Sequence, residues 1–322
     1  MPALKRIRKP ADIQSRKRSI SIIPWIPFRP PMTVKEKRVE LIELFYDLVY
    51  VYAISRMTLI LEEPEGGVPT LDMLALYIIS SLVIIQAWLY MTTYVNRYAM
   101  WRWYEYALTV VNVAAAIVMS TTISESYIEG GTAFVISMIV MISCVGTLYA
   151  IQLYIEKQDV AAARNSFEII MVVLLIYGAS LVLSLCGFKE GSLLINVFVV
   201  ILGIALLLFK HGDYDLKIIS LPHLIERLEL LTIITFGEGI VAITGFFTVS
   251  EISAVSVMIF LTLIFMFGSY VAQVHYICNH HQLKRSSAIT ASHYFIVLSI
   301  NLVTVALLYF KDDARTTSSP PV

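Results

Sequence analysis

The amino-acid sequence predicts an all-α protein: a polytopic transmembrane helix bundle of about nine spans. Of its 322 residues, 58% are hydrophobic and 15% are charged, whereas soluble domains are about half apolar and a quarter charged. Apolar runs of about 20 residues, the length that crosses a bilayer as a helix, recur along the whole chain. Such spans must be helical, because an open sheet would leave backbone groups without hydrogen-bond partners in lipid.

The expected spans are separated by short connections that contain glycine, proline and charged residues, such as EEPEGGVPTLD and KHGDYD. We expect the spans over residues 41–61, 73–94, 104–124, 132–155, 167–187, 192–210, 228–248, 252–278 and 289–310. The chain then divides into a basic, proline-containing arm (1–38), a transmembrane helical domain (39–311) and a short polar tail (312–322).

The distribution of Lys and Arg predicts the orientation of the bundle. When the arm and alternate connections are counted together, 20 basic residues fall on one side of the membrane and 3 on the other. Connections that remain in the cytoplasm carry an excess of basic residues. We therefore expect a cytoplasmic N-terminus and an external C-terminus, which requires an odd number of spans.

The N-terminal arm holds 11 of the basic residues and lacks the apolar stretch of a cleavable signal peptide. We expect it to lie along anionic lipid headgroups; the alternative is a docking site for a protein partner. The lipid bilayer is the main expected partner. We expect no nucleic-acid partner, and the sequence does not predict an oligomeric state.

Carboxylates recur near the cytoplasmic ends of the expected spans. Glu40, Glu43 and Asp47 form one stripe on the first span, at positions i, i+3 and i+7. Other acids at similar depth are Glu105, Glu168, Glu226 and Glu229, and the basic residues near them are Arg102, Arg164 and Arg227. One interpretation is a belt of interhelical ion pairs near the headgroups, extending to Glu43, because charges cost less there than at the bilayer centre.

Two acids lie deeper, and for them a functional interpretation is favoured. Asp47 lies about 9 Å beyond the start of the first span and Glu238 about 15 Å into the seventh. Ionisable groups at such depth mark ion or solute paths, although Glu238 could also be a protonated carboxyl bonded to a neighbouring helix. Gly237 and Gly239 would let that helix approach closely. Arg56, the only basic residue well inside a span, is expected to pair with Glu238, directly or through water.

Polar residues at helical spacing also line three other spans. These stripes contain Gln86, Glu105 and Gln273, each with polar neighbours about one turn away. Stripes of this kind usually make contacts between helices, and the alternative is a hydrated path.

The chain has no familiar catalytic or metal-binding pattern. Its three cysteines form neither a disulfide framework nor a CxxC site. His275, Cys278, His280 and His281 gather at a basic membrane edge, where we expect interfacial residues and not metal ligands. HExxH, Walker and GxGxxG motifs do not occur in the sequence. We therefore expect neither an enzyme nor a cofactor.

Two segments resemble motifs of a known family. ELFYDLVYVYAIS at 43–55 and HLIERLELLTIITFGEGIVAI at 223–243 resemble the opening and the later motif of the low-temperature-requirement protein A (LtrA) family of bacterial membrane proteins. The resemblance covers essentially everything after the arm and implies a multi-pass protein of the bacterial cytoplasmic membrane. The family is named for growth in the cold, so cold adaptation is implied without a mechanism. Its recurrent positions correspond to Glu43, Phe45, Asp47, His223, Glu226, Arg227, Gly237 and Glu238.

Our leading hypothesis is passage of an ion or small polar solute. Its binding groups would be Asp47, Glu238 and Glu43, supported by Arg56, Glu226, Arg227, His223, Glu105, Arg102, Gln86 and Gln273. The alternatives are a non-transporting scaffold or regulator in cold or stress adaptation and an intramembrane enzyme on a lipid-like substrate. Transport predicts a hydrated cavity that reaches Glu238, a scaffold predicts a dry core, and an enzyme predicts a lateral opening.

Overall fold

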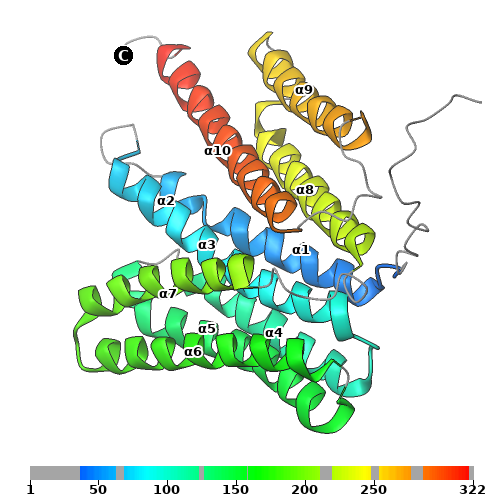
Figure 1. Cartoon of the computed structure of the whole chain (residues 1–322). Helices are drawn as coiled ribbons and strands as arrows, with labels where there is room; N and C mark the ends of the chain where they lie inside the picture. Colours follow the sequence, from blue (N-terminus) through cyan, green and yellow to red (C-terminus); the bar gives the residue numbers. More distant parts are fainter. Residues whose placement is uncertain are drawn as a thin grey trace, which may run out of the picture. The chain divides into compact units, whose positions relative to one another are not determined.

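The structure is a computed structural model that describes residues 37–62, 69–122, 127–157, 159–210, 220–247, 254–276 and 286–318. The chain divides into two units, residues 1–33 and 34–322, and every described residue belongs to the second. Over the described residues, all regular elements are helices (Figure 1). Residues 1–36 of the N-terminal arm and residues 277–285 lie outside this description, so the interpretations of both segments stay predictions.

Each expected span coincides with a long helix in the described part of the chain. The long helices are α1 (Leu41–Arg56), α3 (Leu71–Tyr98), α4 (Trp103–Thr122), α5 (Tyr127–Ile151), α6 (Val160–Leu185), α7 (Lys189–Lys210), α8 (Leu221–Ile243), α9 (Ala254–Tyr276) and α10 (Ser286–Ser318). Shorter elements are α2 (Leu59–Glu62), a π-helical turn at Gln152–Glu156 and a 3-10 turn at Thr244–Phe246. α6 and α8 begin about two turns before the expected spans, and their first two turns include the charged residues Arg164 in α6 and Glu226 and Arg227 in α8.

Eight helical segments are long and apolar enough to cross a membrane, when only the described residues are considered. They are Leu41–Leu61, Leu71–Tyr98, Trp103–Thr122, Gly131–Glu156, Val160–Leu185, Lys189–Leu206, Ala254–Val274 and Ile289–Tyr309. α8 is long enough, but its 23 residues include the charged side chains Glu226, Arg227, Glu229 and Glu238. The chain is thus a multi-pass, all-α membrane protein. Nine spans and the orientation of the termini stay predictions.

Local signals fix the helix ends nearest to the candidate site. Glu40 precedes α1 and forms a capping box with Glu43. At the start of α4, Glu105 accepts hydrogen bonds from the backbone N–H groups of Arg102 (2.6 Å) and Met100 (3.2 Å). α8 begins after Ser220 with a proline in its first turn, where the missing N–H removes no helical hydrogen bond.

The packing of α1 brings two distant parts of the sequence together. α1 contacts α3, α4 and α8, and α8 also packs against α10 (Figure 1). Large aromatic side chains fill the core between these helices: Tyr46, Tyr50 and Trp88 are at most 2% exposed, and the two tyrosine rings stack with centroids 4.4 Å apart. As a result, the acidic turns of α1 lie beside the first turns of α8.

Candidate functional site

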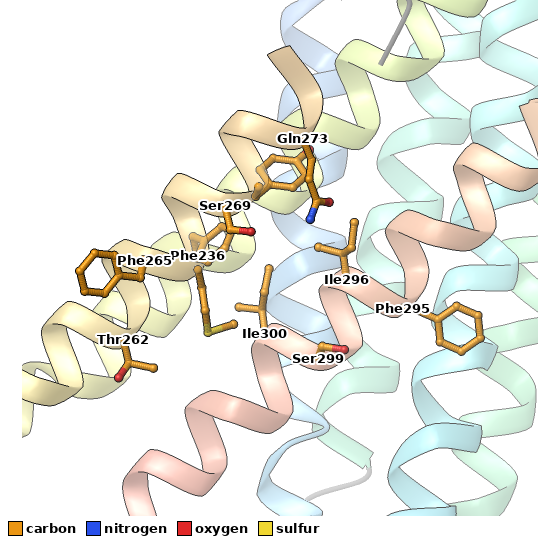
Figure 2. Close-up of a pocket in the computed structure, with 11 residues that line it drawn as sticks. Phe236, Thr262, Phe265, Ser269, Gln273, Phe295, Ile296, Ser299 and Ile300 are labelled. Carbon is orange, nitrogen blue, oxygen red and sulfur yellow. The ribbon is translucent and has the colours of Figure 1, made fainter. Parts of the chain in front are cut away.

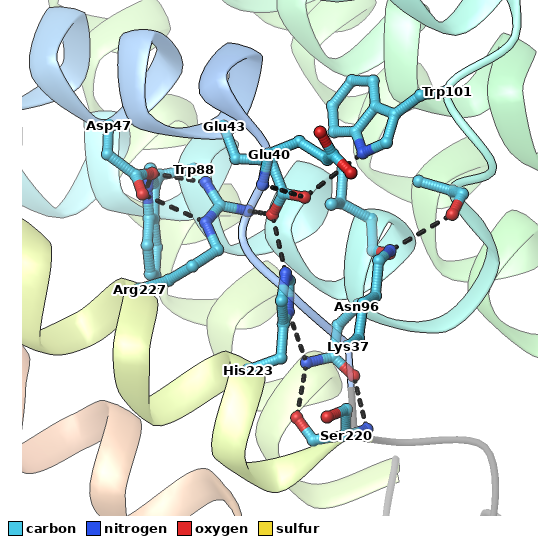
Figure 3. Close-up of polar contacts among 12 residues, drawn as sticks. Lys37, Glu40, Glu43, Asp47, Trp88, Asn96, Trp101, Ser220, His223 and Arg227 are labelled. Carbon is cyan, nitrogen blue, oxygen red and sulfur yellow. Dashed lines mark hydrogen bonds and ion pairs between the residues drawn. The ribbon is translucent and has the colours of Figure 1, made fainter. Parts of the chain in front are cut away.

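Two acids of α1 face a histidine and an arginine of α8. Glu43 and Asp47 are four residues apart, and so are His223 and Arg227, so each pair lies on one face of its helix. All four residues are at most 1% exposed. They form three contacts between α1 and α8: Asp47 with Arg227, Glu43 with His223, and Glu43 with Arg227 (Figure 3). We refer to these four residues as the charge cluster.

The contact between Asp47 and Arg227 is bidentate. Arg227 Nε donates to Asp47 Oδ2 at 3.1 Å, and Arg227 Nη2 donates to Asp47 Oδ1. The indole N–H of Trp88 adds a third bond to Oδ1 at 2.7 Å. The guanidinium carbon also lies 5.4 Å from the ring centroid of Trp88 and 5.7 Å from that of Tyr46, within the range of cation–π attraction. Arg227 is therefore held by charge, hydrogen bonds and aromatic faces together.

The contact between Glu43 and His223 forms the second connection. His223 Nε2 lies 2.9 Å from Glu43 Oε2, and the indole N–H of Trp101 donates to Glu43 Oε1 at 3.2 Å. Arg227 Nη1 lies 3.7 Å from Glu43 Oε2. Because Arg227 lies within ion-pair distance of both carboxylates, a change of charge at one contact acts on the other.

The second ring nitrogen of His223 faces α3. Asn96, which is 5% exposed, has its Nδ2 3.3 Å from His223 Nδ1 and exchanges two hydrogen bonds with the backbone of Ser220. Close by, the ammonium of Lys37 donates to the carbonyls of Val95 and Ala99 at the end of α3 (Figure 3). These contacts tie the start of α8 and the segment before α1 to the end of α3.

Trp101 reaches Glu43 from an unusual backbone conformation. Its φ is +54°, in the left-handed region that bulky residues rarely adopt. Such a conformation costs about 1–3 kcal/mol and is retained where the surroundings determine it, often at functional sites. Here it places an indole donor on Glu43.

The cluster can hold charge in a buried position and can exchange a proton. Each carboxylate has donors or cations at both oxygens, which satisfies the requirement for burying charged groups. A histidine beside a carboxylate is a common arrangement for proton transfer. Among the described residues, no group of three or more His, Cys, Asp or Glu could hold a metal ion.

The predicted belt of ion pairs is only partly present. Arg102 pairs with Glu156 and not with Glu105, which accepts from Tyr94 Oη at 3.1 Å and from backbone N–H groups. Glu226 is exposed and lies outside the cluster. The interpretation of Glu43 as an ion-paired residue is correct, but its partners lie on α8.

The predicted pairing of Arg56 with Glu238 does not occur as a direct contact. The ion pairs among the described residues do not include one between them, and both side chains are half-buried. Close helix approach is found at Gly239, where an added Cβ would lie 3.0 Å from Thr304 Oγ1 of α10, whereas an added Cβ at Gly237 would meet nothing within 4 Å. The arginine that pairs with a deep acid is Arg227, bound to Asp47, although its sequence position suggested the headgroup region. Pairing of Arg56 with Glu238 through water stays a prediction.

Two of the three polar stripes make contacts between helices. Gln86 donates to the carbonyl of Val199 at 3.3 Å and accepts from Tyr177 Oη at 2.9 Å. Asn112, on the stripe of Glu105, accepts from Tyr50 Oη at 2.7 Å and donates to the carbonyl of Met141 at 2.9 Å. The interhelical interpretation is therefore confirmed for these two stripes.

The third stripe lines a groove between α9 and α10. The groove has a volume of about 660 Å³, and Gln273 and Ser269 point into it opposite Ser299 (Figure 2). Most of its remaining lining is apolar and includes Phe236 of α8. Glu238 is not among the lining residues, so this groove is not the cavity reaching Glu238 that the transport hypothesis predicts.

Sequence reasoning missed Trp88, Trp101, Asn96 and Lys37. Tryptophans in apolar segments resemble lipid anchors, and Asn96 resembles one more polar residue at a helix end. A usable signal exists for Trp88, because an indole N–H inside a span needs an acceptor and acids are scarce there. The signal does not identify which acid accepts the hydrogen bond from Trp88.

A comparison with protein-family models matches residues 38–320 to the family described as bacterial low temperature requirement A protein (LtrA). The matched range contains both sequence motifs and all four residues of the charge cluster. Searches of the curated proteins and of the solved structures found no match.

Proposed function

The chain belongs to the bacterial low temperature requirement A family, and from that premise we propose a proton-linked carrier of the cytoplasmic membrane. It moves an ion or small polar solute, and a proton bound at the charge cluster is exchanged in each cycle. One observation carries the proposal: His223 and Glu43 are 2.9 Å apart in a site where both are at most 1% exposed.

The physical argument begins with the cost of buried charge. Ionisable residues inside membrane proteins are expensive and are usually functional. Gain or loss of one proton between Glu43 and His223 changes the net charge by one unit where screening is weak. Because the cluster joins α1 to α8, this change alters the attraction between the two helices. Proton binding is then coupled to their separation.

Glu238 extends the proposal along α8. It follows Arg227 by eleven residues, which is about 16 Å of helix and about 20° from the same face at 100° per residue. Its side chain is half-buried, so a solute can reach it more easily than the cluster. In this proposal Glu238 binds the solute and the charge cluster binds the proton.

A second candidate is a non-transporting scaffold in which the cluster only joins helices. The observation that favours it is the complete set of donors on Asp47, which receives bonds from Trp88 and Arg227 on both oxygens. A carboxylate satisfied in this way needs no further ligand. The two candidates differ in what a neutral substitution at Glu43 or His223 does to flux.

Measurement of flux in liposomes distinguishes the carrier from the scaffold. Purified protein is reconstituted, and the movement of protons and of a panel of monovalent cations is followed with dyes inside the vesicles. Glu43→Gln removes the charge, and His223→Gln retains polarity but removes the titratable ring. Glu168→Gln is the matched control, because Glu168 is exposed on α6.

The carrier predicts that wild type and Glu168→Gln transport one of these ions and that both cluster variants lose at least tenfold in rate at matched amounts of folded protein. Stable cluster variants with wild-type flux would contradict it. Absence of flux in wild type for every tested ion and for small polar solutes would favour the scaffold.

A further inference from the structure

Asn96 links α3 to the first turn of α8 through three polar contacts. The backbone N–H of Ser220 donates to Asn96 Oδ1 at 2.9 Å, and Asn96 Nδ2 donates to the Ser220 carbonyl at 2.8 Å. The same Nδ2 lies 3.3 Å from His223 Nδ1. Asn96 is 5% exposed, and Ser220 and His223 are fully buried.

The orientation of the Asn96 amide follows from Ser220. A backbone N–H can only donate and a backbone C=O can only accept, so the oxygen of the amide must face the N–H and its nitrogen must face the carbonyl. The amide nitrogen has two hydrogens, and one of them is used on the Ser220 carbonyl. The other points toward His223 Nδ1, which must therefore accept and cannot carry a proton.

The other ring nitrogen has the opposite role. His223 Nε2 lies 2.9 Å from Glu43 Oε2, and a neutral ring whose Nδ1 has no proton carries its proton on Nε2. The charged residues around the ring are Glu43 and Asp47 of α1, Arg227 of α8 and Lys37 before α1 (Figure 3). Glu40, at the start of α1, is exposed, and the remaining two anions and two cations balance when His223 is neutral.

We propose that Asn96 is a positioning residue that keeps His223 Nδ1 free of a proton, so that the cluster exchanges its proton only between His223 Nε2 and Glu43. A second proton on the ring would place two donors face to face. It would have to displace Asn96 from His223 and so loosen the start of α8 from α3. The inference rests on the proposed function for its purpose, but the position of the proton can be measured without any transport.

Nitrogen NMR of the histidine rings tests the position of the proton directly. The full-length protein is labelled with ¹⁵N-histidine and placed in lipid nanodiscs at neutral pH, and the signals missing from His223→Gln identify His223. The expected result for wild type is a proton-free Nδ1 and a protonated Nε2. A protonated Nδ1 in wild type would overturn the proposal, whatever the behaviour of the variants.

Two substitutions at Asn96 then test its part. Asn96→Asp replaces the donor with an acceptor, so Nδ1 should become protonated. Asn96→Leu removes the hydrogen-bond donor and the acceptor while the side chain stays similar in size. We therefore expect a mixture of the two neutral tautomers of His223. Signals that stay as in wild type in folded Asn96→Asp protein would overturn the proposal.

Flux then separates the two levels of the account. If Asn96→Asp shifts the pH profile of flux while Asn96→Leu lowers flux without the same shift, Asn96 acts through the proton. If the NMR result is as predicted but the protein moves no solute, the proposed position of the proton stands and the carrier is rejected.

Discussion

At the scale of residues, the stability of the charge cluster depends on the ion pairs and hydrogen bonds that compensate its buried charges. Asp47, Arg227, Glu43 and His223 are almost fully buried, and an ion in such a place costs several kcal/mol unless partners compensate. The indole groups of Trp88 and Trp101 supply hydrogen bonds without adding charge. Removal of one partner therefore costs more than the contact itself contributes, because the remaining ion stays buried.

Arg227→Met tests this dependence. We expect a loss of about 3–5 kcal/mol in the free energy of unfolding, because Asp47 is left without its cation. Addition of Asp47→Asn should restore part of the loss, since the buried side chain at position 47 then carries no charge that needs a cation. Arg164→Met, at an exposed position of α6, should change stability by about 0.5 kcal/mol or less. Denaturant or thermal unfolding in detergent measures all four proteins, and equal stability of the two methionine variants would refute the pairing.

Glu238→Gln separates the solute group from the cluster. Gln retains size and most hydrogen bonds, so protein level and thermal stability should match wild type. Flux should nevertheless be lost, together with any rescue of growth in the cold, because the charge and the exchangeable proton are gone. Glu238→Asp should retain part of the activity, since it keeps the carboxylate and only shortens the side chain. A stable and fully active Gln variant would remove Glu238 from the account.

At the scale of elements, glycines allow close approach between helices because they have no side chain. Gly203 of α7 faces α3, where its carbonyl accepts from Tyr90 Oη at 3.1 Å. A Cβ built at Gly203 would overlap the amide of Gln86, which is itself held by Tyr177 and Val199. Each polar contact of Gln86 therefore depends on the missing side chain of Gly203.

Gly203→Ala should destabilise the protein by about 1–3 kcal/mol, the usual cost of overpacking a core. Gln86→Ala in the same chain should relieve part of that cost, because the colliding amide is removed. Gly178→Ala on α6 is the matched control: nothing lies within 4 Å of its added Cβ, so the helix should be unchanged or up to about 1 kcal/mol more stable. Equal unfolding midpoints for Gly203→Ala and Gly178→Ala would show that α3 and α7 are not in this contact.

At the scale of the whole molecule, the distribution of charge predicts the topology. The 20-to-3 division of basic residues requires the connection near residue 65 to be external and that near residue 215 to be cytoplasmic. Both positions lie outside the described residues. Reporter fusions at the two positions should therefore give opposite compartments. Reports from the same compartment would mean that the number of spans between them is wrong.

The helices were predictable and the pairing between them was not. Apolar runs of the length of a bilayer specify helices wherever they occur, so each expected span has a helix in the described residues. Glu43 and Asp47 were recognisable as acids in an apolar run, and His223 and Arg227 through the family motif. Their contacts depend on tertiary packing across about 180 residues of sequence. For the same reason, depth along a helix suggested Arg56 for Glu238, whereas the short-range ion pair joins Arg227 to Asp47.

In the proposed carrier, Glu43 and His223 act as one proton-exchanging unit, and the rates of flux in a double-mutant cycle show whether they do. The initial rate in liposomes is measured for wild type, Glu43→Gln, His223→Gln and the double variant, at matched amounts of folded protein. Residues that act as a unit are non-additive, so each single substitution should lose about as much rate as the double. Losses that multiply in the double variant, or a stable single variant with wild-type rate, would contradict the account.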